Sequence, residues 1–396
     1  MAELKSKSEI RFTGFTDAWE QRELGQVADI VGGGTPSTNI YAYWSGDIDW
    51  YAPAEIGKQI FLTGSQKKIT ELGLQNSSAK ILPVGTVLFT SRAGIGNTAI
   101  LAKSGATNQG FQSIVPHKDD VDSYFIFSRT HELKRYGETV GAGSTFVEVS
   151  GKQMAKMPIL MPTMTEQKKI GAFFADLDRL ITLHQREYDK TVNIKKAMLE
   201  KMFPKNGADK PEIRFAGFTD AWELRELGDI ATIIMGQSPK SANYTDNPSD
   251  HILVQGNADM NNGQVVPRVW TTQVTKKAEK GDLILSVRAP VGDVGKTNYS
   301  VVLGRGVAAI RGNEFLYQTF VRMKQNGYWN KLSTGSTFDS INSKDIRESL
   351  VMVPMASEQI RIGDFLGSLD RLITLHHREL VKLQNMKKAL LEKMFI

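Results

Sequence analysis

Two segments of the chain carry apolar residues at the spacing of an α-helix. Residues 165–203 and 357–395 contain no proline, and apolar side chains recur along both at steps of three and four. This spacing predicts one apolar stripe on each of two helices, each about 55–60 Å long. The residues predicted to serve helix pairing or the docking of a partner are Ile170, Phe173, Leu177, Leu180, Ile181, Ile362, Phe365, Leu369, Leu372 and Ile373.

A lone helix of this length cannot bury its stripe, whereas two copies in one chain can cover each other. We expect the helices to pair as an antiparallel coiled coil, which would give a pseudo-two-fold axis and put the other segments at opposite ends of a rod. Parallel pairing stays open at this stage. It predicts a large separation between Ile170 and Met394, and antiparallel pairing predicts a small one.

The segments around these helices have a different pattern. Short apolar or β-branched runs, bounded by glycine, proline, asparagine and aspartate, predict strands at Thr86–Ser91, His251–Gln255 and Asp282–Val287. Helical spacing predicts further helices at Ser123–Val140 and Phe315–Leu332. The fold class is therefore α+β, with two mixed α/β domains and two long helices.

The chain is an internal duplication. Residues 10–30 match residues 213–233 at 16 of 21 positions, and residues 165–203 match 357–395 at 25 of 39. We expect a first domain at 1–164, a long helix at 165–203, a second domain at 204–356 and a second long helix at 357–396. The interiors, 31–142 and 234–334, differ in length and sequence. Two related tasks on different targets would explain this, and so would drift after duplication.

Composition narrows the class of protein. The chain has 396 residues, no cysteine and a net charge of +6, with no apolar run long enough to span a membrane. The absence of cysteine excludes disulfides and thiolate zinc sites, and we expect a cytoplasmic protein without a signal peptide. The charge permits a polyanion as partner.

Catalytic motifs are absent from the sequence. We find no phosphate-binding GxxxxGK[ST] loop, no HExxH metal motif, no spaced histidine ligand set and no GxSxG element. His184 and His376 are equivalent positions of the two helices, and we interpret them as seam or surface residues. We therefore expect a binding protein without a metal or a catalytic site.

The sequence motifs that recur in both halves, called the frame below, resemble those of a known family. Each half begins near GFTDAWE-x-R-E-L-G, and the first half continues through Ser91-Arg92-Ala93 and Gly143-Ser144-Thr145-Phe146. Each half then reaches a P-x-x-x-EQ-x-x-I helix that carries LDRLITLH. This order resembles the specificity subunit of type I restriction-modification systems, and it covers nearly the whole chain twice.

The resemblance implies a non-catalytic reader of double-stranded DNA. Each interior would be a target-recognition domain for one half of a bipartite site, and the helices would set the spacer. Methyltransferase subunits, two in number, would dock on the helical regions, and restriction subunits with motor and nuclease activity would complete the complex. S-adenosylmethionine would be bound by the methyltransferase partner, and this chain would bind no cofactor. No membrane is involved.

Base edges and phosphates are contacted by arginine, lysine, asparagine, glutamine, serine and threonine. The candidate DNA-binding residues are Lys58, Lys67, Lys68, Arg92, Ser144, Thr145, Gln255, Asn257, Arg288, Ser336 and Thr337. Arg92 and Arg288 are favoured because a cation follows an apolar strand in both halves. Most lysines could equally be solvated surface residues, and the aromatic cluster at 41–51 is interpreted as core.

Two rival functions stay open. The chain could be a self-sufficient DNA-modifying enzyme with unfamiliar motifs, and methyl transfer by the purified chain alone would support that. It could also be a coiled-coil adaptor without a DNA role, which salt-dependent binding to duplex DNA would contradict.

Overall fold

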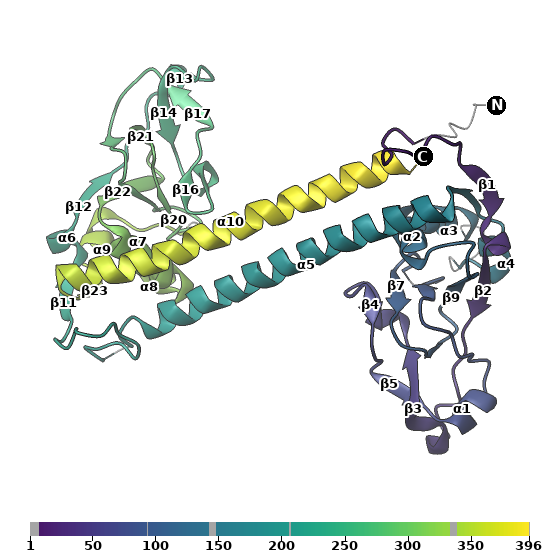
Figure 1. The fold of residues 1–396 in the computed structure, drawn as a ribbon. Coiled ribbons are helices and arrows are strands. Elements are labelled where there is room, and N and C mark those ends of the chain that lie inside the picture. The colour runs from purple at the N-terminus through teal and green to yellow at the C-terminus, as the bar shows by residue number, and fades with distance from the viewer. Residues whose placement is uncertain (1–7, 93, 142–147, 206, 333–338, 396) are drawn as a thin grey trace. The chain divides into compact units, whose positions relative to one another are not determined.

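The computed structural model describes residues 8–92, 94–141, 148–205, 207–332 and 339–395. The chain forms two compact units, and each contains one interior and parts of both long helices (Figure 1). The first unit comprises Met1–Leu183 and Leu380–Ile396, and the second comprises His184–Glu379. Each unit is described by itself below.

The first unit holds a five-stranded sheet of order β2-β9-β6-β7-β4 and a three-stranded sheet of order β5-β3-β8, and β1 pairs with β10. The strands are β1 (Glu20–Glu23), β2 (Ala28–Gly32), β3 (Trp44–Tyr51), β4 (Phe61–Leu62), β5 (Lys67–Ile69), β6 (Val87–Phe89), β7 (Thr98–Leu101), β8 (Ala106–Thr107), β9 (Gln112–Pro116) and β10 (Pro158–Met161). The short helices are α1 (Glu71–Gln75), α2 (Ser123–Ser128), α3 (Thr130–Gly141) and α4 (Gly151–Ala155).

The second unit repeats this plan with more strands. Its sheets have the orders β12-β22-β19-β20-β16-β15 and β13-β17-β14-β21-β18, and β11 pairs with β23. The strands are β11 (Glu223–Glu226), β12 (Thr232–Met235), β13 (Tyr244–Thr245), β14 (His251–Val254), β15 (Met260–Asn261), β16 (Gln264–Val265), β17 (Val269–Thr271), β18 (Lys277–Ala278), β19 (Leu283–Ser286), β20 (Val294–Lys296), β21 (Val301–Leu303), β22 (Val307–Arg311) and β23 (Leu350–Val353). The short helices are α6 (Leu227–Ile230), α7 (Glu314–Gln325), α8 (Tyr328–Leu332) and α9 (Ser343–Arg347).

The two long helices are α5 (Met164–Lys201) and α10 (Ala356–Met394), within a few residues of the predicted bounds. Their contacts run antiparallel within each unit. In the first unit, Lys387 Nζ donates to Asp178 Oδ1 at 2.6 Å, and Phe174 stacks on Phe395 at 5.9 Å between ring centroids. In the second unit, the rings of His184 and His376 lie 5.9 Å apart, and Lys195 Nζ donates to Asp370 Oδ1 at 2.6 Å. Rising numbers on α5 thus meet falling numbers on α10.

Both units share an aromatic core where a long helix ends. In the first, Trp19, Phe125 and Phe395 pack edge to face with centroids 5.7–6.2 Å apart. In the second, Trp222, Phe315 and Phe203 pack with centroids 5.4–5.8 Å apart. These residues are buried, and the aromatic contacts stabilise the packing beyond the area they bury. The repeated tryptophan of the GFTDAW segment is therefore a core residue.

The repeated polar motifs are also structural. Arg11 donates to both carboxylate oxygens of Glu166 at 2.9 and 2.7 Å, and Arg214 donates to both of Glu358 at 2.7 Å. The hydrogen bond to the glutamate raises the pKa of each arginine above its ordinary value. These two bidentate ion pairs join a segment near the start of each repeat to the first turn of the long helix that ends the same repeat.

The glutamine that follows each glutamate closes the same turn. Gln167 Nε2 donates to the Pro162 carbonyl at 3.0 Å, and Gln359 Nε2 donates to the Pro354 carbonyl at 2.9 Å. The P-x-x-x-EQ motif is therefore explained by two contacts, one from each polar side chain. It holds the frame and needs no ligand.

Most expectations about secondary structure are confirmed, including the α+β class and the three predicted strands, which correspond to β6, β14 and β19. The two predicted shorter helices are each interrupted. The first breaks at Arg129 between α2 and α3, and the second breaks at Asn326 and Gly327 between α7 and α8. Gly327 has a φ of +65°, which a helix cannot contain.

The predicted apolar stripes are confirmed in part. Ile170, Leu177, Ile362 and Leu369 are buried, and Phe173, Ile181, Phe365 and Ile373 are partly buried. Leu180 and Leu372, which are equivalent positions, remain 41% and 43% exposed. Within the described chain they are therefore not covered by helix pairing, and their alternative role in partner docking stays a prediction.

Candidate nucleic-acid interface

Three predicted DNA-binding residues meet in the second unit. Gln255 follows β14, Asn257 begins the next short turn, and Arg288 follows β19, and all three line a hollow of about 180 Å³. Arg305, in the turn between β21 and β22, and Ser238, after β12, line the same hollow and were not among the candidate DNA-binding residues given above. No described residue that lines it is acidic. The hollow thus combines two guanidinium groups, two carboxamides and two hydroxyls, those of Ser238 and Ser286.

The loop that carries Gln255 is held by its backbone. The Gln255 amide donates to Asp259 Oδ2 at 2.7 Å, and Asp259 is buried. A Cβ on Gly306 would lie 2.1 Å from the Gln255 carbonyl oxygen, so only glycine permits this approach. The Gln255 side chain, whose Oε1 lies 3.4 Å from the Tyr244 hydroxyl, therefore projects from a fixed support.

The first unit has the same backbone frame around its Arg92. The Ser91 amide donates to the Gly110 carbonyl at 2.8 Å, as the Val287 amide donates to that of Gly306 at 2.9 Å. Arg92 forms an isolated antiparallel bridge with Glu148, and Arg288 forms one with Ser340. Arg92 and Arg288 thus occupy equivalent positions, as the sequence predicted.

Further backbone contacts extend this equivalence. The Asn108 amide donates to the Tyr51 carbonyl at 3.0 Å, and the Gly304 amide donates to the Val254 carbonyl at 2.7 Å. Ala52 directly follows Tyr51, and Gln255 directly follows Val254. Each of these amides is held by the acid that ends the following turn: Glu55 at 2.9 Å for Ala52, and Asp259 for Gln255.

Different side chains occupy equivalent places of this shared frame. Gln255 corresponds to Ala52, and Arg305 corresponds to Gln109, since Asn108 matches Gly304 in the same turn. The loops after β2 and β12 approach this turn in their respective units: Thr35 Oγ1 donates to Gln109 Oε1, and the Arg305 amide donates to Ser238 Oγ at 3.1 Å. The backbone contacts are thus the same in the two units, whereas the side chains that they support are different.

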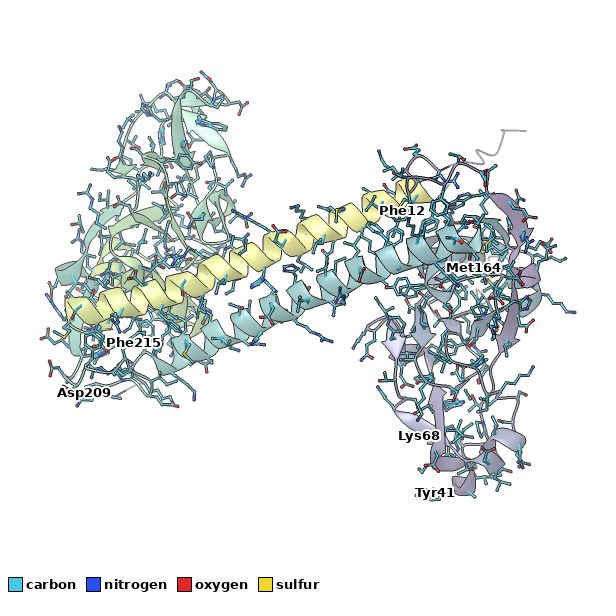
Figure 2. All side chains as sticks on the ribbon, in the orientation of Figure 1. Phe12, Tyr41, Lys68, Met164, Asp209 and Phe215 are labelled. Atoms are coloured by element: carbon cyan, nitrogen blue, oxygen red, sulfur yellow. The ribbon has the colours of Figure 1, made fainter. Side chains whose placement is uncertain are left out.

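Lys67 and Lys68 line a separate hollow of about 740 Å³ in the first unit, together with Tyr41 and Trp44. Figure 2 shows Tyr41 and Lys68 at the end of this unit that is remote from α5. Tyr41 is 85% exposed, which contradicts its interpretation as core, whereas Trp50 and Tyr51 are buried as expected. Lys67 Nζ lies 5.9 Å from the Trp44 ring centroid. This hollow offers cations and aromatic surface.

Lys68 has a structural contact as well. Its Nζ lies 3.8 Å from Asp49, which is buried and also pairs with Lys103 at 3.0 Å. Lys58 is exposed and lines neither hollow. The predicted residues Ser144, Thr145, Ser336 and Thr337 lie outside the described residues.

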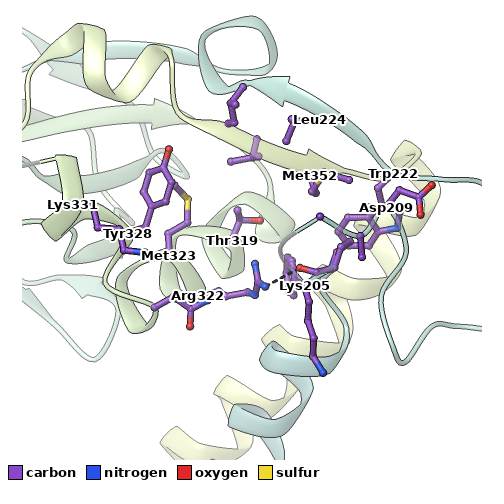
Figure 3. Close-up of a pocket in the computed structure, with 17 residues that line it drawn as sticks. Lys205, Asp209, Trp222, Leu224, Thr319, Arg322, Met323, Tyr328, Lys331 and Met352 are labelled. Atoms are coloured by element: carbon purple, nitrogen blue, oxygen red, sulfur yellow. Dashed lines mark hydrogen bonds between the residues drawn. The ribbon is translucent and has the colours of Figure 1, made fainter.

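Another hollow, of about 620 Å³, lies in the second unit beside the segment that follows α5 (Figure 3). Arg322 donates to the Pro204 carbonyl at 2.9 Å and stacks on Phe203, and burial lowers its pKa. Trp222, Met323 and Met352 supply apolar walls. Its cation faces a backbone carbonyl and an aromatic ring, which is an arrangement that fixes the segment after the helix.

Comparison with known proteins identifies the frame. Residues 16–191 and 219–385 each match the family model of the type I restriction modification DNA specificity domain. The chain belongs to this family. The family that the repeated motifs suggested is therefore confirmed. This family serves DNA recognition rather than catalysis.

Curated relatives agree. The chain is 32% identical over 241 residues to the type I restriction enzyme MjaIX specificity subunit of Methanocaldococcus jannaschii, an alignment that covers 58% of this chain and 55% of that subunit. It is 27% identical to the putative MjaX specificity subunit of the same organism, over 94% of this chain and 92% of the relative. The chain therefore spans about half the length of the first relative and nearly all of the second.

Solved structures have the same fold. The type I restriction-modification S subunit from M. genitalium matches 98% of this chain, with a TM-score of 0.67 and 13% identity. A chain from a study of assembly and conformational transition of the type I restriction-modification system matches 97%, with a TM-score of 0.50 and 23% identity. In the described part of the chain, no helix has the length and apolar character of a membrane span, and no group of three or more acidic or histidine side chains is arranged to hold a metal ion.

Proposed function

We propose that this chain is the DNA-reading subunit of a type I restriction-modification complex and that each domain reads one half of a bipartite site. The observation that carries the proposal is that the two units share the same backbone contacts around the candidate interface but present different side chains there. A base-reading protein needs a rigid support and variable side chains at the base edges. Simple drift would alter supports and exposed positions alike, whereas here the backbone contacts around Gln255 and Ala52 are kept.

We further propose that the helices set the spacer and dock the partner subunits. Leu180 and Leu183 on α5, and the equivalent Leu372 and Leu375 on α10, are exposed in the isolated chain. Exposed apolar side chains at repeat-equivalent positions favour two copies of one partner, because the same surface is then offered twice. The methyltransferase subunit is the proposed partner, two copies per chain, with restriction subunits bound to that assembly.

In this proposal the chemistry belongs to the partners. S-adenosylmethionine would be bound by the methyltransferase subunit, and this chain would bind no cofactor. Because the target is cellular DNA, we place the complex in the cytoplasm. A self-sufficient DNA-modifying enzyme is the alternative, and methyl transfer by the purified chain without a partner would support it.

The test is methylome sequencing of cells that carry this chain and its methyltransferase, with and without exchange of one interior. We expect a two-part methylated motif. Replacing residues 31–142 by the corresponding interior of a relative should replace one half of the motif and leave the other half and the spacer intact. Inserting about four residues, near one helical turn, into α5 should change the spacer only. A change in both halves after the single exchange would contradict the proposal.

A further inference from the structure

The matched frames separate the exposed residues into constant and variable positions. The arginine after the central strand is constant, as Arg92 and Arg288. The residue directly after β3 is Ala52, whereas the residue directly after the equivalent strand β14 is Gln255. The turn between β8 and β9 carries Gln109, whereas the equivalent turn between β21 and β22 carries Arg305. DNA has a similar division, because phosphates are the same at every site and base edges are not.

We propose, on the basis of the proposed function, that Arg92 and Arg288 bind DNA phosphates, whereas Arg305 and Gln255 read bases in the half-site of the second domain. Gln109 has the corresponding reading role in the first domain, where Ala52 leaves the second reading position without a polar group. The two half-sites are thus distinguished mainly at these two frame positions.

The available hydrogen-bonding groups support this division. Among the described residues, Arg288 and Arg305 form no ion pair, so both guanidinium groups remain available to a ligand. A free guanidinium at Arg305 suits the O6 and N7 acceptors of guanine. The carboxamides of Gln255 and Gln109 suit the N6 donor and N7 acceptor of adenine.

Backbone constraint makes these positions precise. Gly306 lets the turn that carries Arg305 close on the Gln255 carbonyl, and Ser238 holds the Arg305 amide. The two reading residues are therefore positioned relative to each other before DNA binds. Discrimination between bases requires such positioning, because a side chain that moves freely can satisfy several base edges.

The experiment compares Arg305→Gln with Arg288→Gln in the full chain assembled with its methyltransferase. Arg305→Gln should relax or change one base position of one half-site by about 5- to 150-fold in discrimination, leaving the other half-site unchanged. Arg288→Gln should lower methylation at all sites with the motif unchanged, and should reduce the slope of log affinity against log salt by about 1. Lys210→Gln removes one exposed charge outside the hollow and serves as the control.

The reciprocal variant Gln109→Arg should alter the other half-site. If Arg305→Gln abolishes methylation altogether, Arg305→Lys provides the second measurement, since it keeps the charge but loses the two-pronged contact and should relax the same base position. A uniform loss with an unchanged motif for Arg305→Gln and Arg305→Lys would overturn the assignment. So would a changed motif for Arg288→Gln. If the wild-type complex itself gives no two-part motif, the proposed function fails rather than this assignment alone.

Discussion

The two units share their repeated ion pairs and differ at the exposed turns that line the candidate interface. Glu166 and Glu358 hold equivalent arginines, and Asp178 and Asp370 hold equivalent lysines. The turn that carries Gln109 in one unit carries Arg305 in the other. The comparison indicates that the contacts which place a recognition turn have been kept after duplication, while the turn itself has been free to change.

The largest effect is expected from the frame glutamates. Glu166→Ala and Glu358→Ala each leave a largely buried arginine without its partner, and loss of one member of such a pair costs about 3–5 kcal/mol. If the frames are equivalent, the two variants should lose similar stability in chemical denaturation. Glu20→Ala, in an exposed pair with Arg22, is the control and should cost less than about 1 kcal/mol. A large cost for only one of the two glutamates would break the comparison.

The helix aspartates should differ from each other. Asp178 has a side chain 8% exposed and accepts hydrogen bonds from Lys387 and Tyr124, whereas Asp370 is 33% exposed and accepts from Lys195 and Gln318. Asp178→Asn should cost about 1–3 kcal/mol, and Asp370→Asn should cost less because water compensates part of the loss. Double-mutant cycles with Lys387→Met and Lys195→Met would measure each coupling. Equal couplings would show that burial does not distinguish the two pairs.

The sequence was sufficient for the parts that depend on long-range periodicity. The bounds of α5 and α10 follow from the apolar stripes, and the equivalence of Arg92 and Arg288 follows from the repeated pattern after a strand. The stripes alone left parallel pairing open, and the antiparallel contacts became clear only in the structure. The pattern did not show that Leu180 and Leu372 stay exposed while their neighbours along the helices are covered. Periodicity alone does not say which edge of a stripe is covered.

Interruptions of the shorter helices, and residues from separate loops that meet in one pocket, were harder to predict. The turn signal Asn326-Gly327 could have been used to divide the helix predicted at Phe315–Leu332. The helix predicted at Ser123–Val140 contains no such signal at its break, Arg129. Arg305 and Ser238 were not among the candidate DNA-binding residues chosen from the sequence, because they line the same pocket as Gln255 from separate loops. Only the glycine after Arg305 and after Gln109 was available as a cue, and it becomes meaningful once the two turns are superposed in the frame.

The smallest predicted effect concerns a feature of the first unit alone. Burial raises the pKa of Asp49, but hydrogen bonds from the Ser65 amide and hydroxyl, together with Lys103, outweigh this, so the pKa lies below its ordinary value. A carboxylate with a lowered pKa adds stability that is fully present above the unfolded value of about 3.9 and is lost as the pH falls through the folded value.

The strand register gives Ile252 as the counterpart of Asp49, because Tyr51 and Val254 occupy equivalent positions. The second unit therefore lacks this source of acid sensitivity. Asp49→Asn should flatten the dependence of unfolding free energy on pH below about 4, by less than about 1 kcal/mol because Lys103 is half exposed. Denaturation midpoints of wild type, Asp49→Asn and the exposed control Asp246→Asn between about pH 3 and 6 would measure it. If the control flattened the curve as much as Asp49→Asn, the buried carboxylate would not be the cause, and the acid response would not distinguish the two units.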